Sequence, residues 1–117
     1  MAFKFEKLEV WQKSLALSLD IHELTRKFPR EELYILTAQI KRAADSVVLN
    51  IAEGSTGQTN AEFKLFLSYA IRSAIEVVAC LHVGSRRNLI KEDQFQNLYS
   101  DIETIVKMLH ALRNSLK

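Results

Sequence analysis

The chain has 117 residues, 48% of them hydrophobic and 26% charged, which is the balance of a folded globular protein and excludes a disordered one. A net charge of only +2, from 16 basic and 14 acidic residues, lacks the strong bias of dedicated nucleic-acid binders, although a local basic patch remains compatible with it. A single cysteine excludes an intrachain disulfide, and only 3 Gly and 1 Pro indicate long elements with few turns.

We expect residues 1–117 to form one domain. The beginning of the chain lacks the apolar region of a signal peptide, and charges interrupt every long apolar stretch. These features predict a cytoplasmic protein that does not bind a membrane.

The first element expected is a short arm over residues 1–7, followed by a helix over residues 8–27. This helix should stop before Pro29, because a residue that precedes proline is pushed out of the helical conformation. Pro29 suits the first position of a second helix over residues 29–53, and Gly54 is expected to end that helix in the left-handed conformation.

Thr59 and Glu62 match a capping box, in which hydroxyl and carboxylate each bond a free backbone N–H, and predict a third helix over residues 60–87. Gly84 is expected to weaken the end of that helix. Asn88 can adopt the left-handed conformation, after which Leu89 and Ile90 can fold back on the last turn. A fourth helix is predicted over residues 91–116.

Apolar residues follow three- and four-residue steps in the last three helices, which is typical of helices with one buried face. The expected core positions are Leu33, Leu36, Ile40, Ala43, Ala44, Val47 and Ile51, then Phe63, Phe66, Ala70, Ala74, Val77 and Leu81, then Phe95, Leu98, Ile102, Ile105, Val106, Leu109 and Leu116. Long helices with short connections predict an all-α, antiparallel up-down-up-down four-helix bundle. No alternating run indicates a strand.

The first helix differs because it carries two opposed apolar stripes. One contains Leu8, Trp11, Leu15 and Leu19, and the other contains Val10, Leu17, Ile21, Leu24 and Phe28. A four-helix core needs one stripe, and a second left in water would form a large exposed apolar patch. We interpret the stripe of Val10, Leu17, Ile21, Leu24 and Phe28 as a candidate interface of a homo-oligomer. The alternative is an irregular bundle in which the arm or a loop covers it.

Polar residues also share one face of the second helix, and we call them, with two residues of the third helix, the polar line: Gln39, Arg42, Ser46, Asn50, Glu53, Ser73 and Glu76. A buried Arg42–Glu76 pair, with Asn50 and Ser73 as hydrogen-bond partners, is the expected arrangement. Such a network is more typical of a device that fixes helix register than of a catalytic or ligand site.

The remaining residue types predict neither a metal site nor a cofactor. His22, His82 and His110 belong to no paired motif, and Cys80 and His82 lie on different helix faces, whereas zinc needs three or four convergent ligands. The loop over residues 54–60 lacks the lysine and the preceding strand of a phosphate-binding loop. We therefore expect a protein without catalytic residues, metal or cofactor.

Basic residues gather at two of the three helix connections. In an up-down bundle these two connections lie at the same end, which would collect six cations: Arg26, Lys27, Arg30, Arg86, Arg87 and Lys91. This basic end is a candidate contact for the phosphate backbone of RNA or DNA. The alternative is a solvated bundle end whose cations complement helix C-termini.

The central segment over residues 39–54, QIKRAADSVVLNIAEG, resembles the signature Q-x-x-R-A-A-x-S-[VI]-x-x-N-I-A-E-G of a known family. The opening Val10-Trp11-Gln12 and the later Glu62-Phe63 are similar to the same family, which is that of four-helix bundle proteins encoded in intervening sequences of bacterial 23S ribosomal RNA genes. The family name reflects gene location.

This resemblance implies a small bacterial bundle that assembles as a homopentameric ring. It also implies kinship with the accessory protein of diversity-generating retroelements, a strongly basic branch that binds nucleic acid and a reverse transcriptase. The residues leave two functions open. One is a non-enzymatic homo-oligomer that binds RNA or DNA weakly and without sequence preference, and the other is an oligomeric scaffold for a protein partner with no nucleic-acid role.

Overall fold

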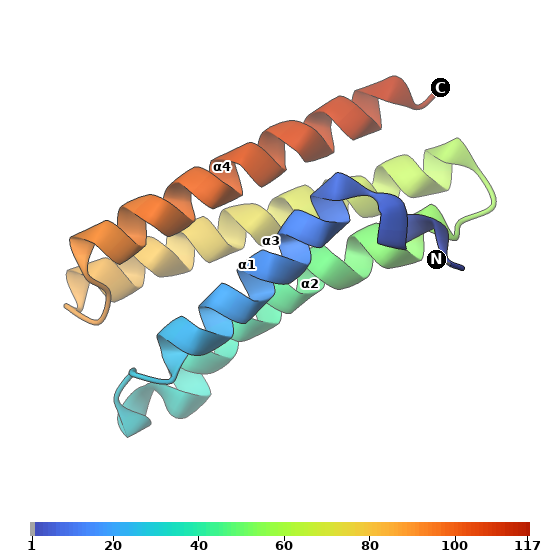
Figure 1. Cartoon of the computed structure of the whole chain (residues 1–117). Helices are drawn as coiled ribbons and strands as arrows, with labels where there is room; N and C mark the ends of the chain where they lie inside the picture. Colours follow the sequence, from blue (N-terminus) through green and yellow to red (C-terminus); the bar gives the residue numbers. More distant parts are fainter. Residues whose placement is uncertain (1) are drawn as a thin grey trace.

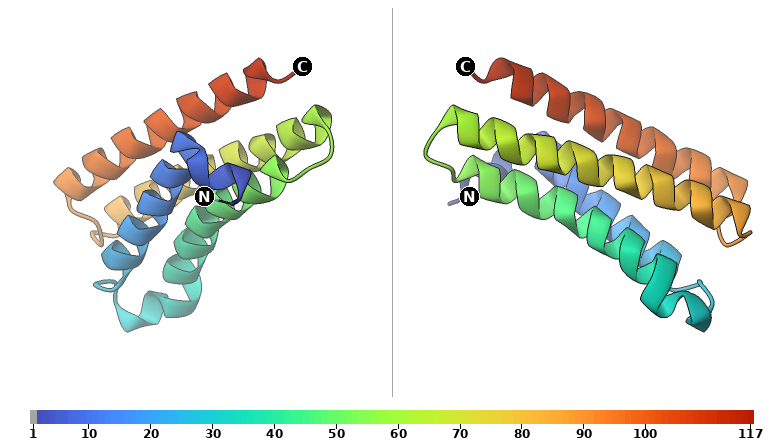
Figure 2. Two further views of the ribbon diagram at one scale, coloured as in Figure 1. Left: turned by 45° about the vertical axis from the view of Figure 1, so that its right-hand side comes forward. Right: turned by 180° about the vertical axis from the view of Figure 1, so that it is seen from behind.

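The computed structural model describes residues 2–117, and Met1, the first residue of the expected arm, lies outside them. Over this range the chain forms α1 (Glu9–Thr25), α2 (Ala38–Ser55), α3 (Asn60–Arg86) and α4 (Glu92–Ser115), without a strand. Successive helices run in opposite directions, and both chain ends lie at the same end of the bundle (Figures 1 and 2). The predicted all-α four-helix bundle is confirmed.

The helices form an elongated body of 44 × 23 × 22 Å, in which α2–α3, α3–α4, α1–α2 and α1–α4 are in contact. α3 is the most apolar of them. An 18-residue window within it has a mean hydropathy of 1.4, so by length and composition alone it could cross a membrane. In the bundle α3 packs against both α2 and α4 and buries nine residues. It thus has the position of a core helix, and core helices can be as long and as apolar as membrane-spanning ones.

The two stripes of α1 have the opposite roles from those expected. Val10, Leu17, Ile21, Leu24 and Phe28 are all at most 8% exposed and belong to the core of this one chain. The prediction that they form an interface between subunits is therefore wrong. The other stripe is only partly covered, because the ring of Phe5 in the arm packs edge-on against Trp11 at 4.9 Å, whereas Leu15 and Leu19 remain 42% and 64% exposed.

The second helix begins differently from the prediction. Pro29 is extended, with ψ of 148°, and precedes a short 3₁₀ turn, η2 (Arg30–Glu32), and a π-helical turn, η3 (Leu33–Thr37). Regular α-helix starts only at Ala38. A π turn holds one residue more than an α turn and rotates the faces before it. Leu33, expected in the core, is consequently 45% exposed.

Two glycines serve close packing instead of helix termination. Gly54 has no positive φ and lies inside α2, where a Cβ would be 2.6 Å from Phe66 Cβ on α3. Gly84 is buried within α3, and a Cβ there would be 2.6 Å from Cδ1 of Ile90. The predictions of a left-handed cap at Gly54 and of a weak helix end at Gly84 are both wrong. Each glycine lets a neighbouring segment approach a helix backbone.

Local expectations for the second half of the chain are confirmed, with one exception. The Thr59 hydroxyl accepts a hydrogen bond from the backbone N–H of Glu62 at 3.1 Å and caps α3, but among residues 2–117 the Glu62 carboxylate does not bond the Thr59 N–H, so only half of the predicted capping box forms. Asn88 has a φ of 60°, in the left-handed region. The Leu89 N–H then donates to the carbonyl of Gly84 at 2.9 Å, and Ile90 is buried against the end of α3. This turn directs α4 back along α3.

Candidate nucleic-acid interface and polar line

The connections α1–α2 and α3–α4 lie at the same end of the bundle, opposite the two chain ends (Figure 1). The six cations of the basic end therefore come from two parts of the chain that are far apart in sequence. The link is direct, since Arg87 at the end of α3 contacts Glu32 in η2. Lys27 and Lys91 line one small pocket beside Asn88. The arrangement joins α1, the α1–α2 connection and the α3–α4 connection.

Two of the six cations, Arg26 and Arg87, form ion pairs with carboxylates of the same chain. Arg87 Nη1 donates to both carboxylate oxygens of Glu32, at 3.0 and 3.2 Å. Arg26 lies 3.7 Å from Glu23, one turn earlier in α1, with both side chains well exposed. Lys27, Arg30, Arg86 and Lys91 form no ion pair within residues 2–117 and are exposed. Four of the six cations thus remain available to an external anion.

The polar line joins α2 to α3 through two side-chain hydrogen bonds, one between serine hydroxyls and one from an amide to a carboxylate. The hydroxyls of Ser46 and Ser73 are 2.8 Å apart, and Asn50 Nδ2 donates to the Ser46 hydroxyl at 2.9 Å and to its carbonyl at 2.8 Å. Closer to the basic end, Gln39 Nε2 donates to the Glu76 carboxylate. The Ser46–Ser73 and Gln39–Glu76 bonds cross between the antiparallel helices at two heights, so they fix how far one helix can slide along the other, whereas the Asn50 bonds orient Ser46 within α2.

The expected buried Arg42–Glu76 pair is not formed. Arg42 is exposed, and its Nη1 reaches Gln39 Oε1 at 3.4 Å. Gln39 takes the position beside Glu76 that the prediction gave to the arginine. Glu53 is also exposed, and its side chain forms no hydrogen bond or ion pair within residues 2–117, although its backbone carbonyl accepts a hydrogen bond from the Thr56 hydroxyl. The outer members of the line therefore face solvent, and the central serines and Asn50 are half-buried.

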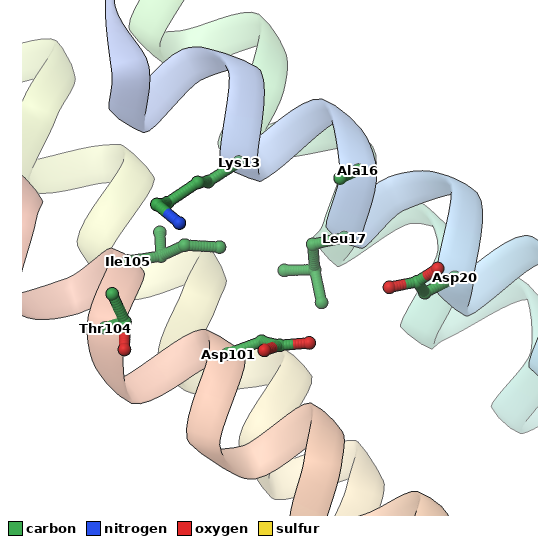
Figure 3. Close-up of a pocket in the computed structure, with 7 residues that line it drawn as sticks. All are labelled: Lys13, Ala16, Leu17, Asp20, Asp101, Thr104 and Ile105. Carbon is green, nitrogen blue, oxygen red and sulfur yellow. The ribbon is translucent and has the colours of Figure 1, made fainter.

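A cavity of about 180 Å³ opens between α1 and α4, the least tightly joined neighbours (Figure 3). Lys13 and Asp20 extend from α1, and Asp101 and Thr104 from α4. Desolvation raises the pKa of Asp20, and the nearby Asp101 carboxylate raises that pKa further. This seam places two carboxylates and Lys13 around one cavity. It was not predicted, because residues on α1 and α4 are paired by the tertiary fold and not by sequence spacing.

An apolar groove that the sequence did not predict lies between η3 and the first turn of α2 on one side and α3 on the other, and we call it the α2–α3 groove. Tyr34, Ile35 and Val83 line this groove and are 87%, 60% and 40% exposed. The groove has a volume of about 480 Å³, and Arg87 also lines it. It results from the π turn, which places Tyr34 and Ile35 on the outside of the bundle. A large exposed apolar surface of this kind is typical of a contact with another macromolecule.

The histidines and the cysteine lie in separate surroundings. His22 is 3.5 Å from Asp45, the ring of His82 meets that of Phe95, and His110 contacts Arg113. Cys80 is buried, and its burial and the Glu76 carboxylate raise the pKa of its thiol. The described residues contain no group of three or more His, Cys, Asp or Glu placed to hold a metal ion.

The sequence profile of the 23S rRNA-intervening sequence protein family matches residues 6–111. The fold is similar to the crystal structure of a protein of unknown function from the S23 ribosomal protein family of Bacteroides thetaiotaomicron, with 28% identity and a TM-score of 0.83 over 89% of this chain and 97% of that one. No curated protein matches the sequence. Neither similarity indicates an enzymatic family.

Proposed function

Since the chain belongs to the 23S rRNA-intervening sequence protein family, we propose that it is a non-enzymatic homo-oligomer whose basic end binds the phosphate backbone of RNA or DNA without reading sequence. The observation that supports this most directly is the collection of six cations at one end, four of them without an ion pair among residues 2–117. Side chains of this kind contact phosphates and position a nucleic acid, but carry no sequence information.

The distribution of charge at the basic end predicts weak binding of nucleic acid by a single protomer. Glu31, Glu32, Glu92 and Asp93 lie among the six cations, so a single bundle offers little net charge at this end. Weak attraction per protomer is sufficient if several basic ends act together, because joined sites raise the effective concentration of each contact. The nucleic-acid proposal therefore depends on assembly, and the resemblance to the family leads us to expect a pentamer.

The α2–α3 groove is the surface that we assign to self-association. Tyr34, Ile35 and Val83 are exposed apolar side chains on this groove, and burial of each would stabilise an assembly by about 1–3 kcal/mol. Leu15 and Leu19 on α1 form the alternative apolar surface. Of the six cations of the basic end, only Arg87 lines the groove, and it is paired with Glu32, so the four cations without an ion pair lie outside this contact.

Binding is tested by fluorescence anisotropy of a labelled single-stranded RNA at several salt concentrations. Log affinity should fall linearly with log salt, with a slope near 0.7 per phosphate neutralised. The double substitution Arg86→Gln and Lys91→Gln should weaken binding and make the slope shallower by up to about 1.4 per protomer. Lys107→Gln, on α4 towards the opposite end, is the matched control. Absence of binding even at low salt would refute the proposal and favour a scaffold for a protein partner.

Assembly is tested by light scattering, which should give a multiple of the 13.4 kDa protomer mass. Ile35→Asp should lower that mass, because a carboxylate would have to be desolvated in the contact. Leu19→Asp places the same charge on the α1 surface. If Leu19→Asp dissociates the assembly and Ile35→Asp does not, the interface lies on α1; a monomeric parent protein would contradict the oligomer itself.

A further inference from the structure

A pocket on the α1–α2 side of the basic end has more cationic side chains in its lining than the other four described pockets. It lies between the end of α1, the turn at Pro29, η3 and the beginning of α2, and it encloses about 230 Å³. Its polar lining consists of His22, Thr25, Arg26, Arg30, Thr37 and Lys41. This volume is several times the roughly 30 Å³ that one water molecule occupies, so a phosphate group fits.

The lining holds three permanent cations and a histidine, and no carboxylate. The two pockets between α1 and α4 contrast with it, since Asp20 and Asp101 line both. Attraction between unlike charges grows as the surroundings exclude water, and a concave site concentrates it. Among the five pockets described for residues 2–117, this one is therefore the best suited to an anion.

Two carboxylates near the pocket, Asp45 and Glu23, have partners within the chain. Asp45 accepts a hydrogen bond from the Ser18 hydroxyl at 2.6 Å and lies 3.5 Å from His22. Glu23 lies 3.7 Å from Arg26 on the exposed side of α1. Arg30 and Lys41 form no ion pair among residues 2–117. The two cations without a partner come from different elements, Arg30 from the α1–α2 connection and Lys41 from α2.

The backbone around the pocket is well anchored. Phe28 is buried in the core on one side of Pro29, and Thr37, 6% exposed, ends the π turn on the other. Thr25 is buried too, and its hydroxyl donates to the carbonyl of His22 at 3.1 Å. The floor of the pocket is consequently fixed by the core, and only the ends of long cationic side chains need to move to contact a ligand.

We propose that this pocket is a discrete binding site for one phosphate group, held by Arg26, Arg30 and Lys41. In part this rests on the proposed function, because a backbone phosphate of nucleic acid would occupy the site as one of the contacts of the basic end. A free phosphate or a terminal phosphate monoester offers the same chemistry. Lys41 distinguishes the pocket from the rest of the basic end, because it lies on α2 and is not one of the six cations from the helix connections. A substitution of Lys41 therefore tests the pocket alone.

The test uses two probes with the full-length protein. Inorganic phosphate is titrated at low salt while the amide NMR shifts of the protein are followed. Binding of a labelled single-stranded RNA without a terminal phosphate is measured separately by fluorescence anisotropy. Phosphate should shift resonances between residues 25 and 41. Lys41→Gln and Arg30→Gln should each weaken phosphate binding about three- to tenfold, as expected for loss of one charge-assisted contact in a partly exposed site. Lys107→Gln should leave it unchanged, and melting curves check that each variant folds.

The outcomes separate this inference from the function on which it partly rests. If RNA binding depends on Arg86 and Lys91 while Lys41→Gln behaves like Lys107→Gln with both probes, the basic end binds nucleic acid and the pocket proposal is wrong. If phosphate binds in the pocket and RNA does not bind at all, the site stands as one for free phosphate and the proposed function fails. If phosphate changes the amide shifts evenly at all the basic residues, the proposal of a discrete phosphate pocket is also wrong.

Discussion

Gly54 on α2 and Phe66 on α3 are in such close contact that a Cβ on the glycine would lie 2.6 Å from Phe66 Cβ. Phe66 Cβ is attached directly to the backbone and cannot rotate away. Gly54→Ala should therefore separate α2 from α3 and lower the free energy of unfolding by about 1–3 kcal/mol, although alanine favours a helix intrinsically. Urea unfolding measures this. Gly84→Ala is the matched control, since it meets the flexible end of Ile90 and should cost less; equal costs would contradict the argument.

The polar line predicts unequal effects of its members. Ser46→Ala removes a hydroxyl that bonds Ser73 and Asn50, and should lower the free energy of unfolding by about 0.5–1.5 kcal/mol. Arg42→Ala removes an exposed side chain with one long bond to Gln39, and should change it by less than about 0.5 kcal/mol. Thermal melting with light scattering checks both. A larger loss for Arg42→Ala would show that this arginine is buried in the assembled protein.

The seam between α1 and α4 predicts a pH effect. Burial and Asp101 raise the pKa of Asp20 above its ordinary 3.8, so the folded state holds the proton more tightly than the unfolded chain. The free energy of unfolding then falls as pH rises from 3.8 through the folded pKa. Asp20→Asn should raise stability at pH 7 by a few tenths, about 0.5 kcal/mol at most, because solvent screens this exposed group. The gain should vanish below pH 3.8; Glu103→Gln on α4 is the control.

Cys80 predicts slow thiol chemistry. The side chain is buried, and burial and the Glu76 carboxylate raise the pKa of the thiol, so little reactive thiolate exists at neutral pH. A chromogenic thiol reagent should modify Cys80 much more slowly in the native protein than in the protein unfolded by denaturant, as measured by the rate of colour development. Glu76→Gln should accelerate the native reaction modestly by removing the second cause. Rapid labelling of the native parent protein would show that α3 opens at this position.

Sequence reasoning succeeded where one physical rule acts locally. Pro29 separated the first two helices, Thr59 marked the start of α3, and Asn88 marked the left-handed turn after it. Each of these residues imposes its conformation on adjacent backbone, whatever the rest of the chain does. Helix count and order followed from such signals and from apolar spacing.

The same reasoning failed where two elements compete for one position. Spacing revealed two apolar stripes on α1, but not that Val10 and Ile21 face the core while Leu19 faces solvent. That choice depends on the other helices and on Phe5, which covers Trp11. The predicted partner of Glu76, Arg42, likewise lies about one helical turn from the observed partner, Gln39. The position of α2 along the axis of α3 is set by close contacts such as that of Gly54 with Phe66, which sequence spacing does not reveal.

The π turn at Leu33–Thr37 gives the chain one residue more than a regular helix needs there. Deleting a single residue within this turn would convert it to an α turn and leave the faces of α2 beyond Ala38 in place. The same deletion in the middle of α2 would rotate Val47 and Ile51 out of the core. The turn is thus a point at which chain length can vary between related proteins, and each variation would change which side chains border the α2–α3 groove while the bundle persists.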